Sequence, residues 1–142
     1  MNPMRYLNPC LFAALLVMLT PGCHKPASEK TTFEGRWSGI EPGQPEAKCS
    51  LVITGTQLEY RGSQSNDWCR GTFVLNEKAR PRQMDLTMRE TPAPQDVGMT
   101  ILVIYELQGE ELKVAIAPPG SPQRPTRLAS GEGNRFFSFM RD

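Results

Sequence analysis

Apolar and polar residues alternate with a period of two in several short stretches of this chain. The clearest pair is 100–107 and 111–117, which a turn at Gly109 separates. The first stretch is rich in β-branched and aromatic residues, which suit a largely buried strand. In the second stretch alternate residues form one apolar face: Leu112, Val114 and Ile116. This pattern predicts a β-hairpin with one packed and one wetter face.

Six further stretches have strand-like composition, and turn-forming residues lie between neighbours. With the hairpin, the predicted strands are 33–40, 48–54, 57–61, 68–76, 83–89, 100–107, 111–117 and 135–141. No helical period follows residue 32, and a long, proline-punctuated connection precedes the last strand. Such a chain forms an antiparallel barrel or a sandwich. We expect an all-β, antiparallel barrel of about eight short strands over 33–142, because closure removes exposed sheet edges.

The first 22 residues have the pattern of a targeting signal. Arg5 supplies a positive charge, and the apolar run at 11–19 is too short for a permanent membrane helix. The residues before Cys23 resemble the end of a bacterial lipoprotein signal. This resemblance implies that Cys23 becomes the N-terminus and carries a fatty acyl group such as palmitate. Leu19 lies four residues before Cys23 instead of three, and ordinary signal-peptidase cleavage near Gly22 is the alternative.

Residues 23–32 are polar and contain proline, serine and lysine. We expect them to form a flexible tether between the signal and the barrel domain. Acylation at Cys23 would place the protein outside the cytoplasm, anchored to a membrane by its lipid. Ordinary cleavage would instead release a soluble periplasmic or secreted protein.

The charge of the chain argues against nucleic acid as a partner. The sequence holds 16 Lys and Arg against 15 Asp and Glu, and removal of Arg5 with the signal makes the two numbers equal. A neutral chain has no strong field that steers it to nucleic acid or to anionic lipid. The 39% of hydrophobic residues is typical of a globular domain.

The four cysteines divide by position. Cys10 lies in the signal and Cys23 at the processing site, which leaves Cys49 and Cys69 as a pair in a compartment that permits disulfides. We expect a Cys49–Cys69 disulfide that stabilises the fold by about 3 kcal/mol in the chain-entropy model. Two buried free thiols are the alternative. In a meander one strand lies between the two cysteines. The resulting Cα separation exceeds that of a normal disulfide unless the strand ends bend inward.

The predicted domain lacks the residue types of common catalytic and metal sites. Its only histidine, His24, lies in the tether, which removes histidine-based zinc sites and Ser-His or Cys-His nucleophiles. Cys49 and Cys69 lack zinc-knuckle spacing, and no glycine-rich phosphate loop occurs. Glu106 shares a face with Ile104. It is a half-buried acid if that face is the inner one, and a strand-end ion pair is the competing interpretation. We expect no enzymatic activity and no cofactor.

Several short motifs are spread in order over 33–142. They are Gly35-x-Trp37, Gly71-Thr72-Phe73, Pro81-x-x-Met84-Asp85-Leu86-Thr87, Ile104-Tyr105-Glu106-Leu107-x-Gly109 with Leu112-Lys113, and Ala117-Pro118-Pro119-Gly120-x-Pro122 with Arg124-Pro125-Thr126. Together they resemble a family of small exported domains abundant in planctomycete bacteria, which has no assigned activity. That family resembles lipocalin-like barrels, in which the tryptophan of Gly-x-Trp plugs the closed end. The chain departs from many such relatives at Ala115, where they carry a cysteine, and the Cys49/Cys69 pair is not a family feature.

Two functions agree with these observations. The first is a non-catalytic envelope module whose loops contact another envelope protein. The alternative is a lipocalin-like binder that holds a small apolar ligand near Tyr60, Tyr105 and Phe137 at an open mouth. The volume of the barrel interior separates the two. We expect a filled interior, because the inward positions are mostly Leu, Ile, Val, Met and Phe, and a small eight-stranded barrel is just wide enough for its own side chains.

Overall fold

Each predicted strand forms in the structure, with ends that differ from the predicted ones by at most two residues. The computed structural model describes residues 32–142. Its strands are β1 (Gly35–Ile40), β2 (Lys48–Thr54), β3 (Gln57–Arg61), β4 (Trp68–Asn76), β5 (Arg82–Glu90), β6 (Thr100–Gln108), β7 (Glu111–Ile116) and β8 (Arg135–Arg141). The predicted signal, Cys23 and nearly all of the tether lie outside the described residues.

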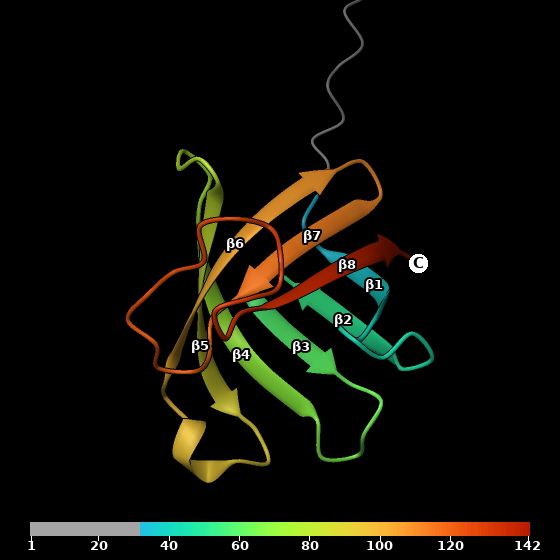
Figure 1. Ribbon diagram of the computed structural model, residues 1–142, viewed down its shortest axis with the longest axis vertical. Helices are drawn as coiled ribbons and strands as arrows, with labels where there is room; N and C mark the ends of the chain where they lie inside the picture. Colours follow the sequence, from blue (N-terminus) through green and yellow to red (C-terminus); the bar gives the residue numbers. More distant parts are fainter. Residues whose placement is uncertain (1–31) are drawn as a thin grey trace, which may run out of the picture.

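The strands pair in sequence order, each antiparallel to the next, and β8 returns to pair with β1 (Figure 1). The sheet is therefore a closed barrel without a free edge, and the predicted fold is confirmed. The only helix in residues 32–142 is the short η1 (Pro94–Asp96) between β5 and β6. None in that part of the chain is long and apolar enough to span a membrane.

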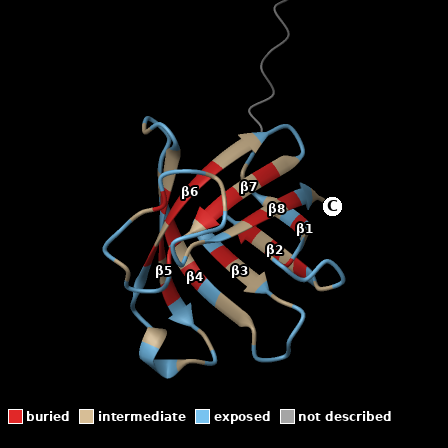
Figure 2. Ribbon diagram, in the orientation of Figure 1, coloured by how far each residue is buried: buried red, intermediate tan, exposed pale blue. Residues whose placement is uncertain are grey.

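Alternation along the strands carries apolar side chains into the barrel (Figure 2). The residues predicted to share an inward face on two of the strands are buried, namely Cys49, Leu51 and Ile53 on β2 and Met84, Leu86 and Met88 on β5. The same cluster includes Leu112 and Val114 of β7, as the hairpin pattern predicts. Burial of these side chains is the main force that favours the barrel.

The two ends of the barrel differ because the connections alternate between them. The tight turns after β2, β4 and β6 lie at one end, which we call the closed end, together with residue 32 and the C-terminus. The longer connections after β1, β3, β5 and β7 lie at the other end, which we call the mouth (Figure 1). The mouth is therefore built from loops, and the closed end from turns and chain termini.

Trp37 closes the barrel at the end where β1 begins. Its side chain is completely buried, and the guanidinium of Arg141 lies 4.2 Å from the ring centroid. Arg141 also donates to the backbone oxygens of Glu34 and Thr32, at 2.7 and 2.5 Å, and forms an ion pair with Glu110 at 3.2 Å.

The connection between β7 and β8 crosses the outer surface of the barrel over β5, β6 and β7 (Figure 1). Arg124 anchors it by donating to the backbone oxygens of Met84 and Val103, at 3.1 and 2.8 Å. Ile104 and Ala115 face this side and are only 1% and 0% exposed. The crossing thus covers a second, smaller apolar layer outside the barrel.

That outer layer explains why the faces of β6 were ambiguous in the sequence. The inner residues are Ile101, Val103 and Tyr105, whereas Ile104 points outward under the crossing. Glu106 shares the outer face and lies opposite Lys113 on β7. The face that Glu106 shares with Ile104 is thus the outer one, so the condition under which Glu106 would be an interior acid is not met. Both faces of β6 are apolar because both are covered, so alternation alone does not distinguish them.

Candidate functional site

The barrel encloses a cavity of about 730 Å³ that opens at the mouth. Its walls are mainly aliphatic side chains on the inner faces of the strands, including Leu58, Met84, Leu86, Met88, Ile101 and Val103. Several of these retain a few per cent of exposed surface, whereas Trp37 and Leu112 near the closed end have none. The expectation of an interior filled by side chains is therefore wrong.

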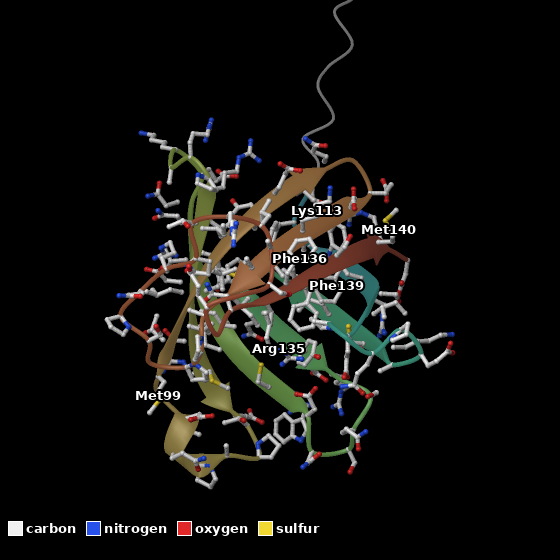
Figure 3. All side chains as sticks on the ribbon, in the orientation of Figure 1. Met99, Lys113, Arg135, Phe136, Phe139 and Met140 are labelled. Carbon is white, nitrogen blue, oxygen red and sulfur yellow. The ribbon has the colours of Figure 1, made fainter. Side chains whose placement is uncertain are left out.

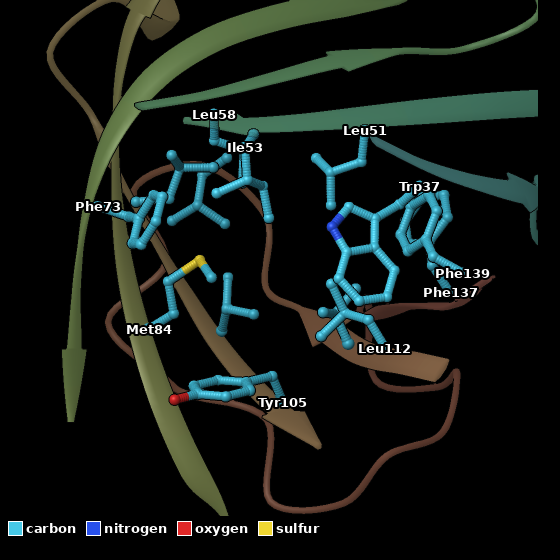
Figure 4. Packing of buried hydrophobic residues seen from close by; sticks show 14 of the residues in the cluster. Trp37, Leu51, Ile53, Leu58, Phe73, Met84, Tyr105, Leu112, Phe137 and Phe139 are labelled. Carbon is cyan, nitrogen blue, oxygen red and sulfur yellow. The ribbon is translucent and has the colours of Figure 1, made fainter. Parts of the chain in front are cut away.

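One side of the interior is packed with aromatic rings. Tyr60 of β3 meets Phe137 of β8 edge to face, with ring centroids 5.7 Å apart. Phe137 stacks on Phe139 at 5.6 Å, and Figure 4 shows these two rings together. Because β1 and β2 lie between β8 and β3, this contact fills the part of the interior against β1 and β2. The remaining space lies against the aliphatic strands.

A glycine of β4 lies where that strand approaches β5 closely. Gly71 occupies an inner position of β4, beside a bulge that brings the strand close to β5. A Cβ at this residue would lie 2.3 Å from the backbone oxygen of Thr87, so no larger residue fits without a shift. The close approach of the two strands therefore requires glycine.

Aromatic side chains form the floor of the cavity. Phe33 lines it and contacts Phe73 and Tyr105, with ring centroids 5.7 and 5.1 Å apart. Tyr105 packs behind Phe33 and is 2% exposed. Its hydroxyl has no hydrogen-bond partner among residues 32–142, and burial raises its pKa. The orphaned hydroxyl costs free energy, because it has lost water without gaining a partner.

Polar side chains surround the mouth. The Tyr60 hydroxyl donates to Asp67 on the β3–β4 loop at 3.3 Å. Burial, and secondarily the negative charge of Asp67, raise the pKa of Tyr60. Asp96 of η1 also lines the opening. So does Arg135, the first residue of β8, which Figure 3 labels. The mouth therefore carries charge of both signs above an apolar interior.

The two cysteines of the domain are free thiols, and the predicted disulfide is absent from the structure. Leu51 of β2 lies opposite Tyr60 of β3, which lies opposite Cys69 of β4. β3 thus separates Cys49 from Cys69 by two strand spacings, about 10 Å, whereas disulfides need Cα atoms within roughly 7 Å. The two thiols therefore stay unpaired.

Both thiols are in environments that disfavour the thiolate. Burial, followed by the nearby Glu41 carboxylate, raises the pKa of Cys49 to about 11. Burial, followed by Asp67, raises the pKa of Cys69 to about 11. A thiol with so high a pKa is a poor nucleophile at neutral pH. Cys69 lines the cavity, but its chemistry there is that of a small apolar side chain.

The structure brings together two of the three side chains predicted to bind a ligand. Tyr60 and Phe137 line the cavity, whereas Tyr105 lies beneath its floor. Sequence reasoning missed the aliphatic wall and Arg135 at the rim. The alternation of β5 already marked Met84, Leu86 and Met88 as inward-facing, but only the barrel geometry decides whether such side chains meet or leave a space.

No group of three or more His, Cys, Asp or Glu side chains within residues 32–142 is placed to hold a metal ion. A comparison of the chain with protein-family models, with curated proteins and with solved structures finds no match. The function is therefore inferred from the geometry of the cavity and its rim.

The two thiols should react slowly with alkylating reagents in the folded protein. Against an ordinary value of 9.0, a pKa of about 11 lowers the thiolate fraction at neutral pH roughly a hundredfold. The rate should therefore rise with pH until about pH 11.

Peptide mass spectrometry after unfolding without reductant should find Cys49 and Cys69 fully alkylated. A peptide pair linked through these two residues would contradict the structure.

Removing the orphaned hydroxyl should stabilise the barrel. We expect Tyr105→Phe to raise the free energy of unfolding by about 1 kcal/mol, because a buried group without a partner is removed. Tyr60→Phe is the matched control, since the Tyr60 hydroxyl is bonded to Asp67 and its loss should destabilise by about 1 kcal/mol. Urea denaturation measures both. Equal effects of the two substitutions would show that the Tyr105 hydroxyl has a partner in solution.

Proposed function

We propose that this protein binds a small apolar ligand inside its barrel and catalyses no reaction on it. The observation that carries the proposal is the cavity of about 730 Å³ with aliphatic walls and an opening at one end. Ligand pockets have volumes of roughly 300–1,000 Å³ and mostly apolar linings with a few polar groups. The polar groups here stand at the rim, where they would orient a ligand without being buried by it.

The walls suit a flexible aliphatic ligand better than a flat aromatic one. Met84 and Met88 have unbranched side chains that adapt to irregular shapes. The aromatic residues Tyr60, Phe137 and Phe139 already contact one another, so their faces are not free to sandwich a ring. An acyl or alkyl chain would therefore fit the space with the fewest rearrangements.

Binding without catalysis agrees with the groups that surround the cavity. The Cys69 thiol has a pKa of about 11, and the Tyr60 hydroxyl, whose pKa is also raised, already donates to Asp67. Neither is activated as a nucleophile or poised as a base near neutral pH. The proposal assigns these residues to the lining of the cavity.

The alternative, an envelope module that contacts another protein, has one observation in its favour. Val97 and Met99 on the β5–β6 loop are 49% and 37% exposed. They lie beside the mouth, so a partner that docked there would also cover the cavity entrance. The two functions are compatible, and a ligand-binding assay addresses the cavity alone.

We propose that the domain acts outside the cytoplasm as a lipoprotein anchored through Cys23. The signal-like pattern at the N-terminus supports this location outside the cytoplasm. Residue 32 lies at the closed end, so the mouth is at the end of the barrel remote from the attachment. When fully extended, the ten residues of the tether would span about 35 Å, which is about the length of a ten-residue β-strand. Ligand exchange would then occur on the aqueous side of the domain.

Filling the cavity should abolish ligand binding and spare the fold. We expect Leu58→Trp to weaken the binding of an uncharged solvatochromic dye such as Nile red by at least about tenfold, because the larger side chain occupies the space that the dye needs. Val74→Trp is the control, since Val74 is 73% exposed on the outer face. Fluorescence titration measures affinity and circular dichroism checks the fold. Equal binding by wild type and Leu58→Trp, or none by wild type, would refute the proposal.

The proposed lipid anchor at Cys23 is tested separately from ligand binding. Metabolic labelling with a fatty acid should mark the wild-type protein and leave Cys23→Ser unmarked, because acylation requires the thiol of that residue. Fractionation should recover the labelled protein with membranes. Unlabelled wild-type protein in the soluble fraction would favour ordinary cleavage and release.

A further inference from the structure

The inner face of β8 begins and ends with an arginine. Arg135, Phe137, Phe139 and Arg141 alternate along the strand, and the two phenylalanines are 3% and 1% exposed. Arg141 is at the closed end and Arg135 is at the mouth, where it lines the cavity (Figure 3). The same strand face therefore presents a positive charge at both ends of the interior.

The two arginines differ in the groups that their guanidinium ions contact. Arg141 is held by two backbone oxygens, the carboxylate of Glu110 and the ring of Trp37. Arg135 forms no ion pair with any carboxylate of residues 32–142. Its guanidinium lies over the ring of Phe137, 4.8 Å from the centroid. Stacking on an aromatic face orients a guanidinium and leaves its N–H donors free.

Free donors directly above an apolar cavity suit a particular kind of ligand. A guanidinium has five N–H donors and binds carboxylate and phosphate groups through two parallel hydrogen bonds. Phe137 lines the cavity, so Arg135 stands where the polar end of a chain in the cavity would emerge.

The other charged side chains that line the cavity limit the charge of that head group. Asp67 belongs to the β3–β4 loop and accepts from the Tyr60 hydroxyl, while Asp96 belongs to η1. Both line the opening and both repel an anion. A head group with one negative charge meets one guanidinium and two carboxylates, and each further negative charge strengthens the repulsion.

We propose that the ligand is an amphiphile with an aliphatic chain and a single negative charge, whose head group binds Arg135 at the mouth. This inference rests on the proposed binding function and adds the class of ligand. Arg135 acts as a specificity determinant, since the aliphatic walls would hold chains with any head group.

A set of three amphiphiles with the same twelve-carbon chain tests the proposal. Dodecanoate, dodecanol and dodecyltrimethylammonium carry negative, neutral and positive head groups. The two ionic amphiphiles are used below their micelle concentrations and dodecanol below its solubility limit, and each is tested for displacement of Nile red from the full chain. We expect dodecanoate to bind about tenfold tighter than dodecanol, the factor that one charge-assisted hydrogen-bonded contact supplies. The difference should shrink as salt is added, because the rim is exposed to solvent.

Substitutions at the arginine assign the preference to it. Arg135→Gln should bind dodecanoate and dodecanol equally, with affinity for dodecanol unchanged. Arg135→Lys should keep part of the preference, because it retains charge and loses the paired geometry. Arg127→Gln is the matched control, an exposed arginine of the β7–β8 connection that does not line the cavity, and it should bind as wild type does.

The outcomes separate the two proposals. If wild type binds dodecanoate no tighter than dodecanol, or if Arg135→Gln keeps the preference, the head-group assignment is wrong while cavity binding stands. Tightest binding of dodecyltrimethylammonium would also overturn it and would point to Asp67 and Asp96. If neither the dye nor any of the three amphiphiles binds, the binding function itself fails. A preference for dodecanoate that disappears only in Arg135→Gln supports the proposal.

Discussion

The barrel depends on the return of β8 to β1. Only three residue pairs join these strands, from Trp37 opposite Arg141 to Gly39 opposite Phe139. The seam is reinforced at the closed end, where the backbone N–H of Asp142 donates to the oxygen of Arg36 at 3.0 Å and the Arg141 guanidinium covers the Trp37 ring. Without this closure β1 and β8 would be free edges, and the sheet would have no enclosed interior.

Closure also determines how the interior is divided. It brings Phe137 of β8 near Tyr60 of β3, so aromatic rings fill the part of the barrel next to the seam. The strands on the opposite side supply aliphatic side chains that do not reach one another, and the cavity lies there. Apolar surface without packing partners lowers stability. A ligand that occupied the space would restore those contacts, which links the cost of the cavity to its proposed use.

The sequence by itself determined the strands and their order. Alternation identified the inward faces of β2, β5 and β7, and the short turns at residues such as Gly109 favoured neighbouring antiparallel pairs. These features are local, because a period of two and a turn need only adjacent residues. Asp67 was visible in the sequence as a loop position and Arg135 as the start of a strand, but nothing local indicated that the two border the same opening.

The tertiary structure alone decided which contacts cross the barrel. It placed β3 between Cys49 and Cys69, which prevents their disulfide. It also covered both faces of β6, and the face that carries Ile104 and Glu106 is the outer one. It also left a space between the aliphatic walls, with Tyr105 beneath the floor of the cavity instead of in its lining. Each outcome depends on distances between side chains far apart in the sequence. Alternation assigns a residue to a face, and only the width and closure of the barrel determine what that residue meets.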